Sequence, residues 1–231
     1  MSTDSIAHRL QTVRERISKA EKEAGRDPGA VRLIGISKTQ PANAIRDAYE
    51  AGLRDFGENY LQEALTKREE LRELDICWHF VGKIQGNKTA AIAANFDWVH
   101  GVDRIRIARR LSDQRPAELG KLNCCIEVNL SGEESKGGVN PEALPELAAE
   151  MATLDGLMLR GLMVLPAAAD SFEEQRKPFA KLANALRSLQ GINDSLDTLS
   201  MGMSADLEAA ITEGATMVRI GTAIFGARHY E

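Results

Sequence analysis

The sequence predicts an α/β fold, a closed (β/α)8 TIM barrel with an extra N-terminal helix. Eight short apolar segments alternate with helical segments along the chain, and strands separated by helices form parallel crossovers. Several of these segments are apolar throughout, as strands covered on both faces are. The 231 residues lie near the roughly 250 typical of this barrel. An open doubly wound sheet would also satisfy the alternation, but a count of eight strands favours closure.

The elements follow in order along the chain. The first helix is expected over Asp4–Ala24, where Ile6, Leu10, Val13 and Ile17 recur at helical spacing. The eight expected strands are Val31–Ser37, Arg54–Gly57, Cys77–Gly82, Trp98–Gly101, Leu122–Leu130, Leu159–Leu165, Thr198–Met201 and Met217–Ile220. The expected helices between them are Ala42–Ala51, Asn59–Glu73, Lys88–Ala94, Arg104–Glu118, Pro141–Leu154, Phe172–Leu189 and Ala205–Glu213. No linker interrupts this pattern, so one barrel domain over residues 1–231 is expected.

Composition and charge exclude several classes of protein. The net charge is −5, which lacks the basic footprint of a nucleic-acid-binding protein. No long apolar run and no signal-peptide pattern occur, so a cytoplasmic location without membrane attachment is expected. Cys77, Cys124 and Cys125 have no metal-ligand spacing, and adjacent strand residues point to opposite faces. We therefore expect three ordinary thiols and no metal.

The ends of the predicted strands are where a barrel carries its functional residues, and phosphate is often held after strands seven and eight. The last strand is followed by Gly221 and Thr222, which open a possible short helix whose N–H groups can bind an anion. Strand seven ends in SMGMS and offers Ser200. Asp206 and Glu208 already place negative charge beyond that loop, so the Gly221–Thr222 end is the stronger phosphate candidate.

Lys38 follows the first predicted strand in the segment ISKTQP. A lysine partly removed from water at a barrel mouth has its pKa lowered from about 10.4, and a neutral amine can form a Schiff base with a carbonyl. A lysine whose stem merely packs at a strand end is the alternative. A reactive lysine and a phosphate site on one face indicate a phosphorylated aldehyde, either pyridoxal 5′-phosphate (PLP) or a sugar phosphate.

Arg219 lies two residues before Gly221 and shares its strand face. Its guanidinium could contact the far end of a flat ligand bound at that glycine. An ion pair inside the barrel, with Glu127 or Glu58, is the alternative.

These motifs together resemble a known family. The segments that carry the resemblance are VRLIGISKTQP, FGENYLQE, WHFVGKIQGNK, VNLSGEESKGGV, LRGLMVLP and LSMGMSADLEAAITEGATMVRIGTAIFGAR. They are similar to the pyridoxal-phosphate homeostasis protein family (YggS/PROSC type), over about Val31 to Arg228. The resemblance implies a barrel of PLP fold type III, similar to the N-terminal domain of alanine racemase.

The resemblance also implies the site. Lys38 would hold PLP as a Schiff base, and Arg219 would face the pyridine nitrogen. The phosphate would be held by Ser200, Gly221 and Thr222. The residues implied to line the pocket are Asn59, His79 and Met201.

The function implied is PLP binding for intracellular vitamin B6 homeostasis, without catalytic turnover. Arg219 does not readily give up its proton, so the pyridine nitrogen would remain an acceptor and PLP a weak electron sink. The chain also ends at Glu231, so no second domain is expected to supply an opposing acid or base. A weak racemase-like PLP enzyme acting on amino acids is the alternative, and an aldolase is a third candidate. A monomer is expected, with PLP-dependent apo-enzymes as recipients and Lys136 as a hypothetical second amine for PLP transfer.

Overall fold

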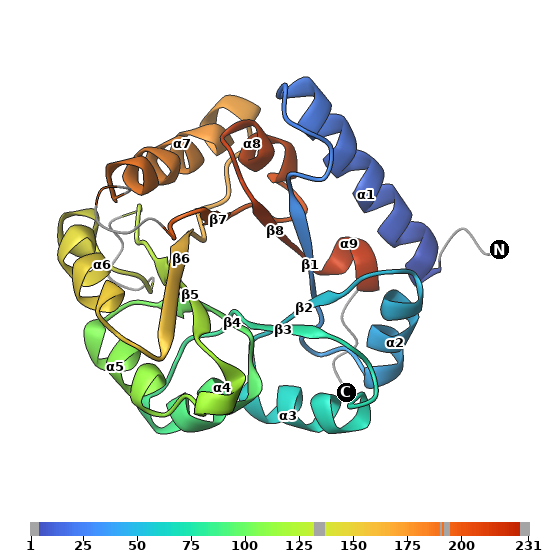
Figure 1. Ribbon diagram of the computed structural model, residues 1–231. Helices are drawn as coiled ribbons and strands as arrows, with labels where there is room; N and C mark the ends of the chain where they lie inside the picture. Colours follow the sequence, from blue (N-terminus) through green and yellow to red (C-terminus); the bar gives the residue numbers. More distant parts are fainter. Residues whose placement is uncertain (1–4, 132–136, 190, 192–194, 227–231) are drawn as a thin grey trace.

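The computed structural model describes residues 5–131, 137–189, 191 and 195–226 (Figure 1). Eight parallel strands follow one another around a closed barrel, and β1 pairs with β8 to close it. The strands are β1 (Arg32–Ile36), β2 (Asp55–Glu58), β3 (Cys77–Phe80), β4 (Trp98–Val102), β5 (Leu122–Glu127), β6 (Leu157–Met163), β7 (Thr198–Ser200) and β8 (Met217–Ile220). The predicted fold class is confirmed.

The helices surround the barrel when it is viewed along its axis (Figure 1). They are α1 (Ile6–Glu23), α2 (Ala42–Glu50), α3 (Leu61–Glu70), α4 (Thr89–Asn95), α5 (Ile105–Asp113), α6 (Leu144–Ala152), α7 (Phe172–Leu189), α8 (Leu207–Thr212) and α9 (Thr222–Phe225). Short 3-10 helices cover Gly86–Lys88, Ala117–Leu119 and Pro141–Ala143. The helix predicted to reach Glu118 ends at Asp113 because Pro116 disfavours helical geometry at the residue before it.

Two apolar layers form the core. The outer layer fills the space between strands and helices, and Cys124 belongs to it. The smaller inner cluster lies inside the barrel and contains Cys125. Its other buried members are Ile34, Trp98, Met163 and Met217. Adjacent cysteines thus face opposite layers, as predicted, and all three cysteines are free thiols.

The extra N-terminal helix α1 covers the side of the barrel next to α8 and α9 (Figure 1). Arg9 donates from Nε to the carbonyl of Ile224 at 2.8 Å, and Arg16 pairs with Glu208 at 2.9 Å. The buried carboxylate of Glu21 accepts a hydrogen bond from the backbone N–H of Val31, directly before β1. These contacts fix α1 against the first and last parts of the chain. Across the described residues, no helix is both long and apolar enough to cross a membrane.

Candidate functional site at the barrel mouth

The pairing of the first and last strands brings Lys38 beside Gly221 and Thr222. β1 and β8 run parallel with Gly35 opposite Ile220, so the segments that follow them lie at the same end of the barrel. One small pocket is lined by Lys38, Gly221 and Thr222 together. Its wall is completed by Ile36, Gln40, Phe225 and Gly226. The amine-bearing turn and the glycine loop predicted from the sequence therefore line the same pocket.

Gly221 precedes the short helix α9 and keeps its backbone open. A Cβ built on this glycine would lie 3.4 Å from the carbonyl oxygen of Ile36 and 3.6 Å from its Cβ. A methyl group would therefore fill the gap between the two strand ends. Thr222 is exposed at the start of α9. Such a glycine lets an anion approach backbone N–H groups closely.

Lys38 lies in a tight turn directly after β1 and is half-buried. The next residue, Thr39, has a φ of 62°, which is an outlier for a β-branched side chain. Its backbone N–H donates to Oε1 of Glu63 in α3 at 2.6 Å. Residues held in such conformations persist where surrounding contacts fix them. The backbone around Lys38 is therefore held by its surroundings and does not follow local preference.

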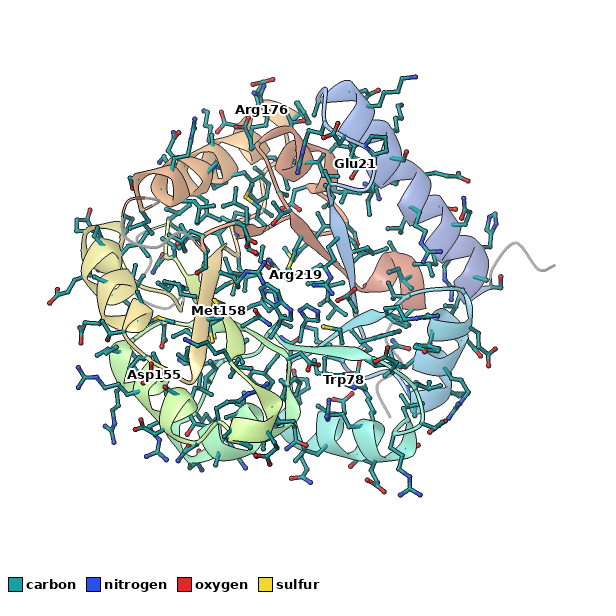
Figure 2. All side chains as sticks on the ribbon, viewed as in Figure 1. Glu21, Trp78, Asp155, Met158, Arg176 and Arg219 are labelled. Carbon is teal, nitrogen blue, oxygen red and sulfur yellow. The ribbon has the colours of Figure 1, made fainter. Side chains whose placement is uncertain are left out.

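Arg219 points from β8 into the barrel, with only 4% of its surface exposed (Figure 2). Its Nη1 donates to Oγ of Ser200 at 2.7 Å, and Nη2 donates to the carbonyl of Val164 at 2.9 Å. The predicted alternative is an ion pair with Glu127 or Glu58. Glu58 pairs instead with Lys67 at 2.7 Å, and among the described residues Arg219 forms no ion pair with Glu127, whose charge acts on it only at longer range. Arg219 is therefore fixed by neutral oxygens.

Ser200 connects Arg219 to a chain of buried polar groups across the barrel. Ser200 Oγ lies 2.8 Å from Nδ1 of His100, and Nε2 of His100 lies 2.9 Å from Nδ1 of His79. Nε2 of His79 lies 2.9 Å from Oδ1 of Asp55. We call these residues, from Asp55 to Arg219, the histidine chain. They come from five strands, β2, β3, β4, β7 and β8.

The proton positions in the histidine chain follow from its two ends. The carboxylate of Asp55 can only accept, so Nε2 of His79 carries a proton. Nδ1 of the neutral His79 then accepts from Nε2 of His100, whose Nδ1 accepts from the Ser200 hydroxyl. The Ser200 oxygen accepts from Arg219. Every hydrogen bond therefore points toward Asp55, and every link is satisfied with both imidazoles neutral.

The pKa directions agree with this assignment. Burial lowers the pKa of His79, although Asp55 opposes the shift. Burial and then the positive charges around it lower the pKa of His100 well below its ordinary value. Burial also lowers the pKa of Arg219 to about 10, and the carboxylate of Asp206 partly offsets that effect. At neutral pH the arginine is charged and the two histidines are neutral.

Asp55 lies at the end of the histidine chain that is opposite Arg219, and Cys77 lies close to both Asp55 and His79. Their donor atoms lie within 4.8 Å of one another, a group that could hold a metal ion. However, Oδ1 of Asp55 already accepts from Nε of Arg32 at 2.8 Å as well as from His79. Burial, followed by the charge of Asp55, raises the pKa of the Cys77 thiol to about 12. Hydrogen bonding and the ion pair with Arg32 account for this cluster.

Asn59 follows β2 at the barrel mouth, and its backbone packs closely on Gly82. A Cβ on Gly82 would lie 2.2 Å from the Asn59 carbonyl oxygen, so this contact requires glycine. Oδ1 of Asn59 is buried without a hydrogen-bond partner, as is Oγ1 of Thr39 beside Lys38. Buried polar atoms normally have partners. The unpaired Thr39 oxygen in the residue after Lys38, together with the Gly221 gap, fits a polar ligand in this mouth.

Three predicted residues do not add side chains to the mouth. The ring of His79 is fully buried between His100 and Asp55. Met201 is fully buried in the outer apolar layer, because it follows the inward-facing Ser200 on β7 and points to the opposite face. Ser200 has its hydroxyl between His100 and Arg219, inside the barrel. Lys136 lies outside the described residues.

Sequence reasoning missed the residues that support the site. His100 alternates with Trp98 on β4, and this inward parity could have identified it. Lys67 gave no such signal, because a lysine on a helix is ordinarily solvated. Its burial depends on carboxylates from β2 and α3 that meet it only in the folded chain.

Comparisons with known proteins show the family to which this chain belongs. The family described as the alanine racemase N-terminal domain matches residues 1–229. A curated relative from Pseudomonas aeruginosa (strain PAO1), named pyridoxal phosphate homeostasis protein, is 58% identical over 230 residues, 100% of this chain and 98% of the relative. The chain belongs to the pyridoxal phosphate homeostasis branch of the alanine racemase N-terminal domain family. The resemblance carried by the motifs is confirmed.

Other members of the homeostasis family match over the same length. The relative of the same name from Escherichia coli (strain K12) is 50% identical, over 98% of each chain. PipY from Synechococcus elongatus PCC7942, solved with PLP bound, is 37% identical. It covers 96% of this chain and 100% of its own, with a TM-score of 0.86. The barrel is thus that of a family with a PLP-bound member.

Proposed function

We propose that the protein binds PLP through a Schiff base with Lys38 and acts in PLP and vitamin B6 homeostasis. The single observation that carries this proposal is the pocket shared by Lys38, Gly221 and Thr222. It places an amine beside a loop open to phosphate, which is what a phosphorylated aldehyde requires. The PLP-bound structure of PipY and the names of the curated relatives support PLP over a sugar phosphate.

The residues at the mouth have separate roles in this proposal. Gly221 and Thr222 bind the phosphate through backbone N–H groups and a hydroxyl. Arg219 lies at the pyridine nitrogen, and Asn59 offers its buried unpaired oxygen to the ligand. Ser200 and His79 act behind Arg219 by holding its guanidinium, since their polar atoms are engaged within the histidine chain.

The same geometry supports binding without turnover. When bound, PLP supplies an aldehyde that condenses with amines and a pyridine ring that accepts electron density. The lowered pKa of Arg219, about 10, still leaves its guanidinium charged at neutral pH. A charged arginine donates to the ring nitrogen and does not protonate it, which weakens the ring as an electron sink. We propose that the protein is a cytoplasmic, monomeric PLP carrier that delivers PLP to apo-enzymes.

Absorption spectroscopy tests the central assignment. Wild-type protein incubated with PLP is expected to show the near-visible band of a lysine Schiff base, and borohydride reduction is expected to fix PLP on the peptide that contains Lys38. Lys38→Ala is expected to lose both signals. Lys177→Ala, which removes an exposed lysine of α7, is the matched control and is expected to retain them. Survival of the band in Lys38→Ala would falsify the assignment.

A racemase-like enzyme is the alternative function, and the resemblance of the barrel to alanine racemase motivates it. Holo-protein incubated with amino acids is expected neither to change their chirality nor to convert them to keto acids. Catalytic turnover that Lys38→Ala abolishes would establish the enzyme instead of the carrier.

A further inference from the structure

The turn that carries Lys38 is held by hydrogen bonds to charged groups of β2 and α3. Glu58 ends β2, and Glu63 and Lys67 lie one turn apart on α3. We call these three residues the α3 clamp. Nζ of Lys67 donates to Oε1 of Glu58 at 2.7 Å and to Oε1 of Glu63 at 2.5 Å. The side chain of Lys67 is 6% exposed and that of Glu58 is 0% exposed.

The α3 clamp binds the residues on both sides of Lys38. Before it, the carbonyl of Ser37 accepts from Nζ of Lys67 at 2.7 Å, and the Ser37 hydroxyl donates to Glu58 at 2.7 Å. After it, the N–H of Thr39 donates to Glu63 at 2.6 Å. The backbone on each side of Lys38 is therefore fixed by a single connected ionic network.

Stability alone does not explain such a network. Taking charges out of water is costly, and apolar residues of similar volume often replace buried ion pairs without loss. The clamp also holds Thr39 in the left-handed region, which is unfavourable for its β-branched side chain. Strain maintained by surrounding contacts beside a reactive group is a feature of functional sites. The clamp thus maintains one backbone geometry at the position of Lys38.

We propose that Lys67 and Glu63 are positioning residues for Lys38, which present its amine to the aldehyde carbon of a ligand whose phosphate lies at Gly221 and Thr222. This inference rests on the proposed function. In the step that it assists, the Lys38 nitrogen forms a C=N bond with the aldehyde carbon, and the aldehyde oxygen leaves as water. The clamp residues contact the backbone beside Lys38 and do not touch the reacting atoms.

Three variants on α3 test the proposal. Glu63→Ala removes the acceptor of the Thr39 N–H, whereas Glu63→Gln keeps an amide oxygen there. Glu69→Ala is the matched control, because Glu69 lies on the same helix in an exposed pair with Arg72. Glu63→Ala is expected to slow the appearance of the PLP Schiff-base band by about tenfold or more, since a misplaced group loses much of its advantage of proximity. Glu63→Gln and Glu69→Ala are expected to react near the wild-type rate.

A second measurement needs no cofactor. Apo-protein is treated briefly with acetic anhydride, and the acetylation of Lys38 relative to exposed Lys177 is measured by peptide mass spectrometry. Glu63→Ala and Lys67→Met are expected to change this ratio, with circular dichroism confirming the fold of each variant. If Lys67→Met does not fold, the Glu63 pair decides the outcome.

The two proposals fail in different ways. Wild-type protein that forms no Schiff base with PLP contradicts the proposed function, and the acetylation ratio then decides whether the clamp sets the reactivity of Lys38. Wild-type protein that forms the Schiff base, alongside a folded Glu63→Ala with unchanged rate and unchanged acetylation, overturns the clamp.

Discussion

Lys38, in the turn after β1, and Arg219, inside the barrel, are supported in opposite ways. The turn of Lys38 is held by the α3 clamp, in which Glu58, Glu63 and Lys67 interact as ions from outside the strand ring. Arg219 is held inside the barrel by a serine hydroxyl, a backbone carbonyl and two imidazoles behind them. One support is ionic and the other is mostly neutral.

This difference shows how each support treats the charge of the group that it holds. A carboxylate in contact with Arg219 would form an ion pair and compete with a ligand for the guanidinium. Neutral acceptors orient it without neutralising it. In the α3 clamp, in contrast, the charged groups pair with one another and with the backbone on both sides of Lys38. Burial still raises the pKa of Glu58 despite the opposing effect of Lys67, so this support depends on its lysine.

The largest expected effect comes from breaking the ionic support. Lys67→Met leaves the buried Glu58 without its cation, which is expected to lower the free energy of unfolding by about 3–5 kcal/mol. Urea denaturation measures this change. Adding Glu58→Gln is expected to recover part of the loss, whereas Lys177→Met in an exposed pair is expected to have little effect. If Lys67→Met lowers the free energy of unfolding no more than Lys177→Met does, the buried ionic support contributes no more than an exposed ion pair.

A smaller effect is expected from the neutral support. Ser200→Ala removes the hydroxyl between His100 and Arg219 and leaves two buried polar atoms unpaired. The expected loss is about 1–3 kcal/mol in the free energy of unfolding, measured in the same way. Ser188→Ala, whose exposed hydroxyl donates to the carbonyl of Ala185 within α7, is the control. Equal losses of stability in the two variants would show that the Ser200 hydroxyl does not stabilise the histidine chain.

A third expected effect is a pH dependence of the histidine chain. The pKa values of His79 and His100 are lowered in the folded protein, so the unfolded chain binds more protons below its ordinary histidine pKa of about 6.5. Stability contributed by the chain is therefore complete above that pH and falls below it. The slope reaches about 1.4 kcal/mol per pH unit for each histidine.

Denaturation curves recorded between about pH 5 and 7 measure this slope. His100→Gln is expected to reduce it, because one of the two protons is no longer taken up. His8→Gln, on the exposed face of α1, is expected to leave it unchanged. A slope in His100→Gln equal to that of the wild type would contradict neutral histidines in the folded chain.

Most of the fold could be predicted because it depends on local pattern. The last strand has the predicted bounds, Met217–Ile220, and α7 likewise matches Phe172–Leu189. β6 begins two residues earlier than predicted, at Leu157, because its pairing with β5 begins at Leu122 and includes an irregularity near Cys124. Boundaries set by a neighbouring strand are not visible in the segment itself.

The candidate site could be predicted in part for the same reason. Lys38, Gly221 and Thr222 follow strands, so the barrel rule places them at one end, and the pocket that they share agrees with this. The supports could not be predicted. His100 contacts Ser200, which is one hundred residues away in the sequence, and Lys67 donates to the carbonyl of Ser37, which is thirty residues away. Such contacts depend on registers and helix placements that no local pattern encodes.

The seam between β1 and β8 gives the site a further property. Lys38 and Gly221 are separated by nearly the whole chain, and they become neighbours only when the first and last strands pair. A nascent or truncated chain without its last strand lacks half of the pocket. A ligand that binds this pocket stabilises only the closed form and links the two ends of the chain. In the proposed function, PLP therefore binds only molecules in which β1 and β8 have paired.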